Sequence, residues 1–225
     1  MQSKIKTDSV NFDDSYLHKG LRRKLVDELR GKGISNNEVL EAINRVPRHV
    51  FMDSGFINFA YKDQAFPIGA GQTISQPYTV AFQTQLLDVQ KREKVLEVGT
   101  GSGYQCAVLL EIGALVYTIE RQRELFLKSQ SILLRLGYKP HFFFGDGYEG
   151  IPADSPFDKI IITAGGNEVP KTLLDQLKVG GKLVMPVGDS AVQRMTLVEK
   201  LSVNEYNTTE HGAFNFVPLL KGRIF

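Results

Sequence analysis

The sequence predicts an α/β protein built on a doubly wound, mostly parallel sheet of seven strands, and three observations predict it. Short apolar runs of β-forming residues alternate with helix-compatible segments through the middle of the chain. A turn with three glycines at alternate positions, between residues 99 and 103, joins one such run directly to a helical segment. Polar residues follow several of these runs, at the edge where open α/β sheets bind their ligands.

Composition limits the class of protein. The 225 residues are 42% hydrophobic and 23% charged, which suits one globular domain with a packed core. The formal net charge of +2 is too small to predict a nucleic acid or an anionic membrane as a partner. No apolar run approaches the roughly 20 residues that span a bilayer, and no secretory signal pattern is found. With Cys106 as the single cysteine, no internal disulfide can form, so we expect a cytoplasmic protein.

Residues 1–90 are expected to form a helical cap and an active-site loop. Leucines at helical spacing predict a helix over 16–30, which Gly31 and Gly33 end. A capping-box pattern over 35–38 begins a second helix, which ends at Pro47. The irregular, aromatic-rich segment 47–75 predicts an ordered loop that either packs on the surface or covers a ligand site. Pro77 then begins a helix over 78–87.

Residues 91–188 are expected to be the ligand-binding core. Apolar runs at 95–98, 115–119, 141–144, 157–163 and 182–187 predict five strands, with helices at 105–110, 122–136 and 170–177 between them. Strands that alternate with helices pair in parallel beneath helices on both faces. In the tail, 189–225, runs at 195–203 and 211–219 predict two more strands. No helix separates these two strands, so we expect them to be antiparallel to a neighbour.

The glycine turn points to the class of ligand. Dinucleotide-binding folds favour the spacing G-x-G-x-x-G, whereas Glu97 and Gly99 to Gly103 read E-x-G-x-G-x-G. An acidic residue beside the turn disfavours a pyrophosphate but suits a ligand that carries an ammonium and a sulfonium group. The pattern resembles the first motif of S-adenosylmethionine-dependent methyltransferases of the doubly wound type. A nucleotide-binding oxidoreductase and a purely structural glycine turn are the alternatives.

Other strand ends carry side chains that fit an adenosine. Glu120 ends the second core strand about 20 residues beyond the turn, where a carboxylate accepts hydrogen bonds from ribose hydroxyls. Asp146, between Gly145 and Gly147, either accepts from an adenine amino group or forms an Asx turn. Thr163 follows the fourth strand. Because the carboxyl ends of parallel strands meet at one edge, we expect these groups to converge on one ligand.

The start of the helix over 78–87 predicts a site for the methyl acceptor. Free backbone N–H groups there and the Ser75 hydroxyl suit a carboxylate, although Ser75 has the alternative role of capping the helix. An ionised carboxylate attacks a methyl group without a general base. The four histidines form no convincing base, and no Cys/His/Asp cluster has metal-ligand spacing, so we expect no metal.

Six short segments together carry a more specific resemblance. The most specific is Gly71-Gln72-Thr73-Ile74-Ser75-Gln76-Pro77, and the others cover 45–48, 66–69, 95–104, 145–147 and 216–219. Together they resemble the protein-L-isoaspartate O-methyltransferases, over a range from about Leu21 to Leu219. The resemblance implies the Rossmann-like fold of S-adenosylmethionine-dependent methyltransferases. It also implies methyl transfer to the α-carboxyl group of L-isoaspartyl residues in damaged proteins and peptides, as a step of their repair.

The same resemblance implies a cofactor, partners and a set of site residues. The cofactor is S-adenosyl-L-methionine, with S-adenosyl-L-homocysteine as product. The partners are isoaspartyl-containing proteins and peptides. We expect the protein itself to be a monomer. Ser75 is the implied catalytic residue, and it contacts the substrate together with Phe216, Val217, Pro218 and Leu219. The implied cofactor-binding residues are Thr73, Ile74, Ser75, Glu97, Gly99, Thr100, Gly101, Ser102, Tyr104, Glu120, Arg121, Gly145, Asp146, Gly147 and Thr163.

Two positions depart from the pattern of this family. Thr79 stands where the family commonly has methionine, and Gly165-Gly166 stand where it commonly has alanines. Both lie near the expected cleft, so they bear on the fit of the substrate more than on the cofactor. The alternative function is a methyltransferase with the same cofactor and a different small-molecule or protein acceptor.

Overall fold

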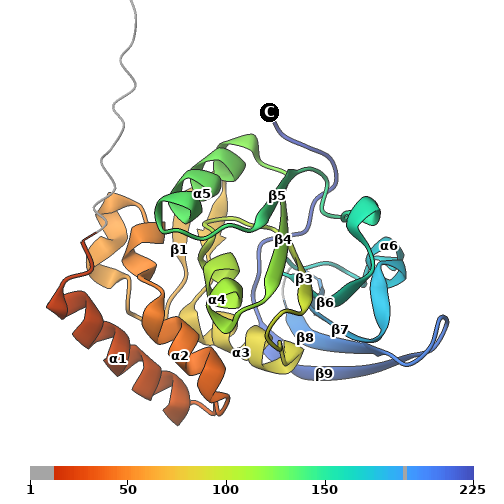
Figure 1. Cartoon of the computed structure of the whole chain (residues 1–225), viewed down its shortest axis with the longest axis horizontal. Helices are drawn as coiled ribbons and strands as arrows, with labels where there is room; N and C mark the ends of the chain where they lie inside the picture. Colours follow the sequence, from red (N-terminus) through yellow and green to blue (C-terminus); the bar gives the residue numbers. More distant parts are fainter. Residues whose placement is uncertain (1–12, 190–191) are drawn as a thin grey trace, which may run out of the picture.

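The structure, a computed structural model, describes residues 13–189 and 192–225. Its main sheet has seven strands in the order β5-β4-β3-β6-β7-β8-β9 (Figure 1). The first five of these pair in parallel, and β8 and β9 are antiparallel to their neighbours. The strands are β3 (Lys94–Val98), β4 (Leu115–Glu120), β5 (His141–Phe144), β6 (Phe157–Ile162), β7 (Leu177–Gly188), β8 (Gln193–Lys200) and β9 (Tyr206–Phe214).

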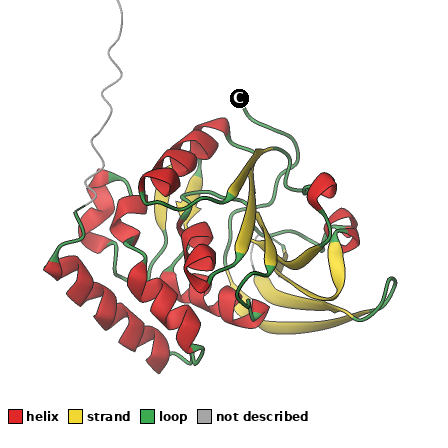
Figure 2. Ribbon diagram, viewed as in Figure 1, coloured by secondary structure: helices red, strands yellow, loops and turns green. Residues whose placement is uncertain are grey.

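Helices cover both faces of this sheet (Figure 2). Successive side chains on a strand point to opposite faces, so Val95 and Ile161 pack into one buried cluster, while Leu96 and Ile160 pack into another. The first cluster includes residues of α4 (Tyr104–Ile112) and α5 (Arg123–Arg135), and the second includes Leu173 of α6 (Lys171–Asp175). The predicted doubly wound α/β fold is therefore confirmed.

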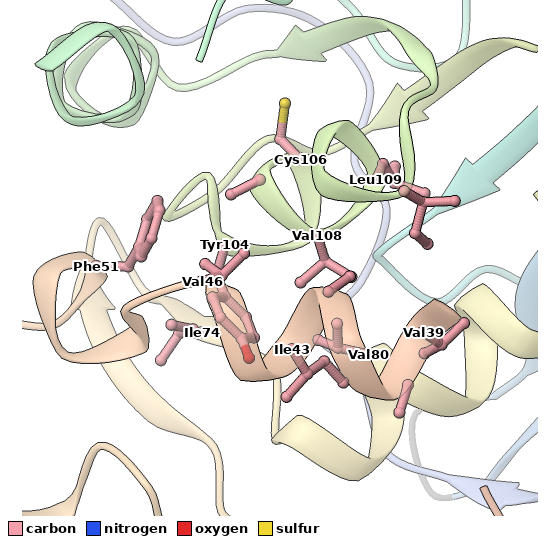
Figure 3. Packing of buried hydrophobic residues seen from close by; sticks show 14 of the residues in the cluster. Val39, Ile43, Val46, Phe51, Ile74, Val80, Tyr104, Cys106, Val108 and Leu109 are labelled. Atoms are coloured by element: carbon pink, nitrogen blue, oxygen red, sulfur yellow. The ribbon is translucent and has the colours of Figure 1, made fainter. Parts of the chain in front are cut away.

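A helical cap precedes the core. It contains α1 (Tyr16–Gly31), α2 (Asn37–Arg45), the short 3-10 helices η1 (Arg48–Phe51) and η2 (Ser54–Phe59), and α3 (Pro77–Leu87). Val39 and Ile43 of α2, and Val46 directly after it, point toward α3 and α4, as Figure 3 shows. The cap for α2 is Asn36, whose side chain accepts from the Val39 N–H, rather than the predicted Ser35. The Ser35 N–H instead donates to Gln85 of α3, which links the two helices.

Segment 66–74 contains a hairpin that the sequence did not predict. β1 (Phe66–Gly69) and β2 (Gln72–Ile74) pair antiparallel within the segment predicted as an irregular loop. Its strands are too short for a period-2 pattern, and Pro67 obscures the first of them. The hairpin brings Ile74 into the core and leaves Ser75 at the start of α3.

Several predicted boundaries in the second half are wrong, including those of the first tail strand, which covers Gln193–Lys200 rather than 195–203. The predicted helix over 170–177 ends at Asp175, and β7 begins at Leu177 rather than at Lys182. β9 covers Tyr206–Phe214 rather than 211–219. As the edge strand it is polar and mostly exposed, so it lacks the apolar alternation that marks a strand. Residues 1–12 of the predicted cap and 190–191 of the predicted tail lie outside the described residues, and the domain boundaries at 90 and 188 stay predictions.

One carboxylic acid lies inside the core. Glu97 of β3 is fully buried, and its Oε2 accepts a 2.5 Å hydrogen bond from the Thr118 hydroxyl. Burial, together with the charge of nearby Glu120, raises the pKa of Glu97 to about 8 despite the opposing hydrogen bonds from Thr118 and Cys106. The folded protein therefore keeps Glu97 protonated at neutral pH.

We expect this protonation to make stability depend on pH. Between the unfolded pKa near 4.5 and the folded pKa near 8, only the folded state holds the Glu97 proton, so its contribution is complete at low pH and is lost as pH rises. From pH 5 to pH 8 the native protein should lose on the order of 2 to 4 kcal/mol of unfolding free energy relative to Glu97→Gln. Urea unfolding at several pH values measures this.

The control for this test is Glu41→Gln, because Glu41 is an exposed residue of α2. That variant should follow the native protein at every pH. Parallel curves for the native protein and Glu97→Gln would show that Glu97 does not hold a proton in the folded state.

Candidate active site

A pocket opens at the carboxyl ends of β3, β4 and β6. It encloses about 800 Å³ of empty space, a volume that includes open solvent at its mouth. Its walls combine the glycine turn after β3, the end of β4, the segment before α3 and the tail after β9. They are formed by Gln72, Thr73, Ile74, Ser75, Val80, Val98, Gly99, Thr100, Gly101, Ser102, Tyr104, Gln105, Ile119, Glu120, Arg121, Gln122, Gly147, Thr163, Ala164, Val217, Pro218, Leu219 and Leu220.

The glycine turn lets the backbone form one side of this pocket. Gly99 has φ +93°, and a Cβ there would lie 2.6 Å from Oγ1 of Thr163. The Thr163 hydroxyl lies 2.7 Å from the Gly99 carbonyl, to which it donates, so β6 and the turn are joined at this point. Only glycine combines this backbone conformation with so close a neighbour. The predicted role of the turn as a close-approach element thus has a geometric basis.

Glu120 fixes the shape of the turn. Its buried carboxylate accepts from the Gly101 N–H at 2.9 Å and from the Gln122 N–H at 2.8 Å. These two bonds connect the end of β4 to the glycine turn and leave lone pairs on both oxygens. A carboxylate held in this way on the pocket wall is an acceptor for ligand hydroxyl groups.

Glu97 does not lie on the wall of the pocket. The structure places it behind the turn, where the Thr118 hydroxyl donates to its carboxyl group. The hydroxyl oxygens of Thr118 and Thr100 are 2.6 Å apart, so Thr118 connects Glu97 to the turn. The predicted direct contact of Glu97 with a cationic ligand is therefore corrected, because its side chain points into the core toward Thr118 and not into the pocket. Glu97 supports the turn from below instead.

Asp146 also lies outside the wall. One of its oxygens accepts from the Tyr148 N–H at 2.9 Å, which is the Asx turn considered as an alternative, and the other accepts from the Gly222 N–H at 2.6 Å. The tail after β9 thus returns to the end of β5, and Arg121 also donates to the carbonyls of Lys221 and Gly222. Of the predicted segment 145–147, only Gly147 contacts the pocket.

Ser75 contacts the pocket and is not the cap of α3. The residue in the cap position is Gln76, which makes no side-chain capping bond. The Tyr78 N–H, one of the groups expected to bind a carboxylate, donates to Asp63 at 2.7 Å. The sequence missed Asp63, because nothing in the segment 47–75 indicates which residue turns back to the helix. The Ser75 hydroxyl keeps the predicted place beside the helix start.

The tail segment forms the wall opposite the turn. The Gly165 N–H donates to the Val217 carbonyl at 2.8 Å, and the Leu219 N–H donates to the Gly165 carbonyl at 2.7 Å. The Phe216 N–H donates to the Gln193 side chain at 2.8 Å. A Cβ at Gly165 would lie 2.5 Å from that side chain, so the glycine at this position leaves room for Gln193. Phe216 packs against the core instead of the pocket, which corrects its predicted place.

The sequence missed eight residues of the wall. Seven of them adjoin a predicted site residue, so extending each motif by one position would have found them: Gln72, Val98, Gln105, Ile119, Gln122, Ala164 and Leu220. Val80 of α3 carries no such signal. Gln105 is buried and donates to the Thr84 hydroxyl at 3.0 Å, a contact between α4 and α3 that only the fold creates.

Arg48 lies buried behind one residue of the pocket wall. Its guanidinium carbon is 4.7 Å from the ring centroid of Tyr104, a cation–π contact. Among the described residues, Nε and Nη1 of Arg48 find no hydrogen-bond partner, and burial lowers the pKa of Arg48 to about 10. The contact orients Tyr104. Segment 45–48, which carried part of the resemblance, therefore acts on the pocket through Tyr104.

A second polar cluster lies in the cap, away from the pocket. Asp14, His18 and His49 bring their ligand atoms within 4.8 Å of one another, which the sequence spacing did not indicate. Arg22 donates to both oxygens of Asp14 at 2.8 and 2.9 Å, and both imidazoles face the Asp13 carbonyl. Burial, and the nearby His18, lower the pKa of His49 to about 4. These bonds hold the start of α1 against η1.

Comparison with known proteins agrees with this geometry. The family model of protein-L-isoaspartate(D-aspartate) O-methyltransferases matches residues 20–224. A protein-L-isoaspartate O-methyltransferase of Christiangramia forsetii is 60% identical over 93% of this chain and 99% of its own length. The enzymes with the same name from Cytophaga hutchinsonii and Flavobacterium psychrophilum are 59% and 57% identical, each over 93% of this chain and over 95% and 99% of their own lengths.

Solved structures show the same fold. A protein-L-isoaspartate O-methyltransferase matches with a TM-score of 0.79 and 31% identity, over 88% of this chain and 65% of its own. A structure from Plasmodium falciparum, in complex with S-adenosyl-L-homocysteine, matches with a TM-score of 0.77 over 89% of this chain and 99% of its own; at 24% identity it supports the fold alone. None of the helices in the described part of the chain has an apolar stretch long enough to cross a bilayer. The chain belongs to the protein-L-isoaspartate(D-aspartate) O-methyltransferase family.

Proposed function

We propose that this protein transfers a methyl group from S-adenosyl-L-methionine to the α-carboxyl group of L-isoaspartyl residues in damaged proteins and peptides. One observation carries the proposal: Ser75 and the segment Val217–Leu219 lie on the same pocket as Glu120 and the glycine turn. A cofactor side and an acceptor side therefore share one space. The relatives that match nearly the whole chain are named for this activity, which supports the choice of acceptor.

The residues present fit an adenosyl cofactor. Glu120 offers free lone pairs to a ribose diol, and the turn at Gly99 presents backbone where a Cβ would clash with Thr163. Val98, Ile119 and Leu219 supply apolar wall for a planar base. When bound, the cofactor supplies a methyl group made electrophilic by the sulfonium. The predicted contacts that would hold it are Thr73, Ile74, Gly99, Thr100, Gly101, Ser102, Tyr104, Glu120, Arg121, Gly147 and Thr163, supported from behind by Glu97, Gly145 and Asp146. Ser75, which the sequence also predicted as a cofactor contact, is assigned to the acceptor side.

The chain's own residues orient the acceptor and exclude water. The Ser75 hydroxyl donates to one oxygen of the isoaspartyl carboxylate and leaves the other oxygen to attack. Because this carboxylate is ionised at neutral pH, the step needs no base. The tail closes the pocket opposite the turn with Leu219 and Leu220, which reduces competition from water.

A different acceptor for the same cofactor is the alternative function. The cofactor side of the pocket would then stay as described, and only the fit around Ser75 would differ. The monomeric state, the cytoplasmic location and the absence of a nucleic-acid partner or a metal remain predictions from the sequence.

The central test of the proposal uses a peptide with one isoaspartyl residue. With labelled cofactor it should yield a base-labile methyl ester, while the same peptide with ordinary aspartate should yield none. Ser75→Ala should lower kcat by about 10², with less than a twofold change in the Kd of S-adenosyl-L-homocysteine, because the hydroxyl orients the acceptor. Methylation of neither peptide, with intact cofactor binding, would refute the acceptor; equal losses in kcat and in affinity would refute the role of Ser75.

A second test concerns the glycine turn. Gly99→Ala should abolish measurable binding of S-adenosyl-L-homocysteine, because the added methyl would overlap the Thr163 hydroxyl at 2.6 Å. Gly137→Ala is the matched control: Gly137 has a similar φ of +85° but nothing within 4 Å of an added Cβ. It should cost about 1 kcal/mol of backbone strain and leave affinity unchanged. Calorimetry measures both; native affinity in Gly99→Ala would show that the turn does not contact the cofactor.

A further inference from the structure

A second hollow lies beside the active-site pocket, between the start of α3 and the end of β9. Its walls share two chain segments with the pocket: Gln76 follows Ser75, and Asn215 lies two residues before Val217. The hollow therefore adjoins the proposed acceptor side and lies away from the turn and Glu120. It is lined by Gln76, Tyr78, Thr79, Phe82, Val192, His211, Gly212, Ala213, Phe214 and Asn215.

Aromatic rings form the main wall of the hollow. The ring centroids of Tyr78 and Phe82 are 5.7 Å apart, and those of Phe82 and Phe214 are 5.2 Å apart. The Tyr78 and Phe214 rings are nearly parallel, 10° apart in angle, and the His211 ring meets Phe82 edge-on at 6.5 Å. All four side chains are half-buried, so each keeps a face for a further partner.

The chemistry of the lining selects an apolar guest. Among the described residues that line the hollow there is no Asp, Glu, Lys or Arg to pair with a charged group. Half-buried aromatic faces gain most by covering an aliphatic or aromatic side chain. Thr79 has a short side chain, which leaves room in the hollow.

Both walls of the hollow are held in place by bonds already described. The Tyr78 N–H is bound by Asp63, whose carboxylate is also paired with Lys32 at 2.7 Å. On the other side, Gln193 bonds the backbone of Phe216 just beyond Asn215. A hollow that is formed before binding orders fewer groups when the guest arrives.

We propose that this hollow, the flank pocket, binds an apolar or aromatic side chain of the substrate polypeptide, one or two residues from the isoaspartyl residue. The inference rests on the proposed function, because only a polypeptide acceptor has a flanking side chain to place there. A chain whose isoaspartyl carboxyl lies at Ser75 continues past Gln76 or Asn215, and each extended residue advances it by about 3.3 Å. The flank pocket thus gives the enzyme a preference among damaged sites.

Isoaspartyl peptides that differ at one flanking position test the proposal. Leu, Phe, Gly or Asp is placed one or two residues before or after the isoaspartyl residue, and kcat/KM is measured for each peptide. At one of these positions Leu and Phe should exceed Gly by about tenfold, and Asp should fall below Gly. Equal values for Leu, Phe and Gly at every position would overturn the flank pocket.

Variants assign the preference to the hollow. Phe82→Ala and Phe214→Ala should reduce the Phe-to-Gly ratio of kcat/KM to about one, and Thr79→Met should reduce it by filling the space. The matched control is Tyr206→Ala, an aromatic residue of the same strand β9 that lies outside the hollow; the ratio should keep its native value. Should Phe82→Ala fail to fold, Phe214→Ala on the edge strand and Thr79→Met still decide the matter.

The outcomes separate this inference from the proposed function. If no isoaspartyl peptide is methylated, the proposed function itself fails. If all are methylated and the preference for Phe survives in Phe214→Ala and Thr79→Met, the function stands and the flank pocket is refuted.

Discussion

Two hydrogen bonds to one carboxylate hold the active site together. Glu120, the last residue of β4, accepts from the backbone of Gly101 in the turn after β3 and from Gln122 at the start of the next segment. Neighbouring parallel strands bring their carboxyl ends side by side, but they do not determine how the loops beyond them are arranged. The two bonds to the Glu120 carboxylate fix the arrangement of these loops. The carboxylate lies on the wall of the pocket, where the same oxygens remain open to a ligand.

Other parts of the fold act through this arrangement. Glu97 and Thr118 support the turn from within the core, and the Thr163 hydroxyl joins it to β6. The tail after β9 crosses the strand ends and is fastened by Gly165, Asp146 and Arg121 to three different loops. The proposed acceptor side is therefore built from segments that are distant in sequence. Gly165 bonds the tail there, and Thr79 lines the flank pocket beside it.

The sequence predicted the elements whose patterns reflect burial on two faces. The strands β3, β4, β5 and β6 are rich in apolar residues, the glycine turn follows β3, and Glu120 ends β4 at the spacing that the parallel fold requires. The predictions failed where other constraints dominate. Edge strand β9 has too few buried residues to show its register, and the short hairpin β1-β2 shows no period. Glu97 and Asp146 lie outside the pocket wall, which the sequence could not show, because a motif gives the position of a residue but not the direction of its side chain.

The affinity of Glu120→Gln for S-adenosyl-L-homocysteine, measured by calorimetry, tests the account most directly. An amide puts an N–H₂ group in place of one oxygen, so it loses a backbone bond and an acceptor for a ribose hydroxyl. The Kd should rise at least about tenfold, while Glu124→Gln, an exposed change on α5, should leave it unchanged. A Kd within twofold of the native value in Glu120→Gln would contradict the claim that the strand ends converge on this cofactor through that carboxylate.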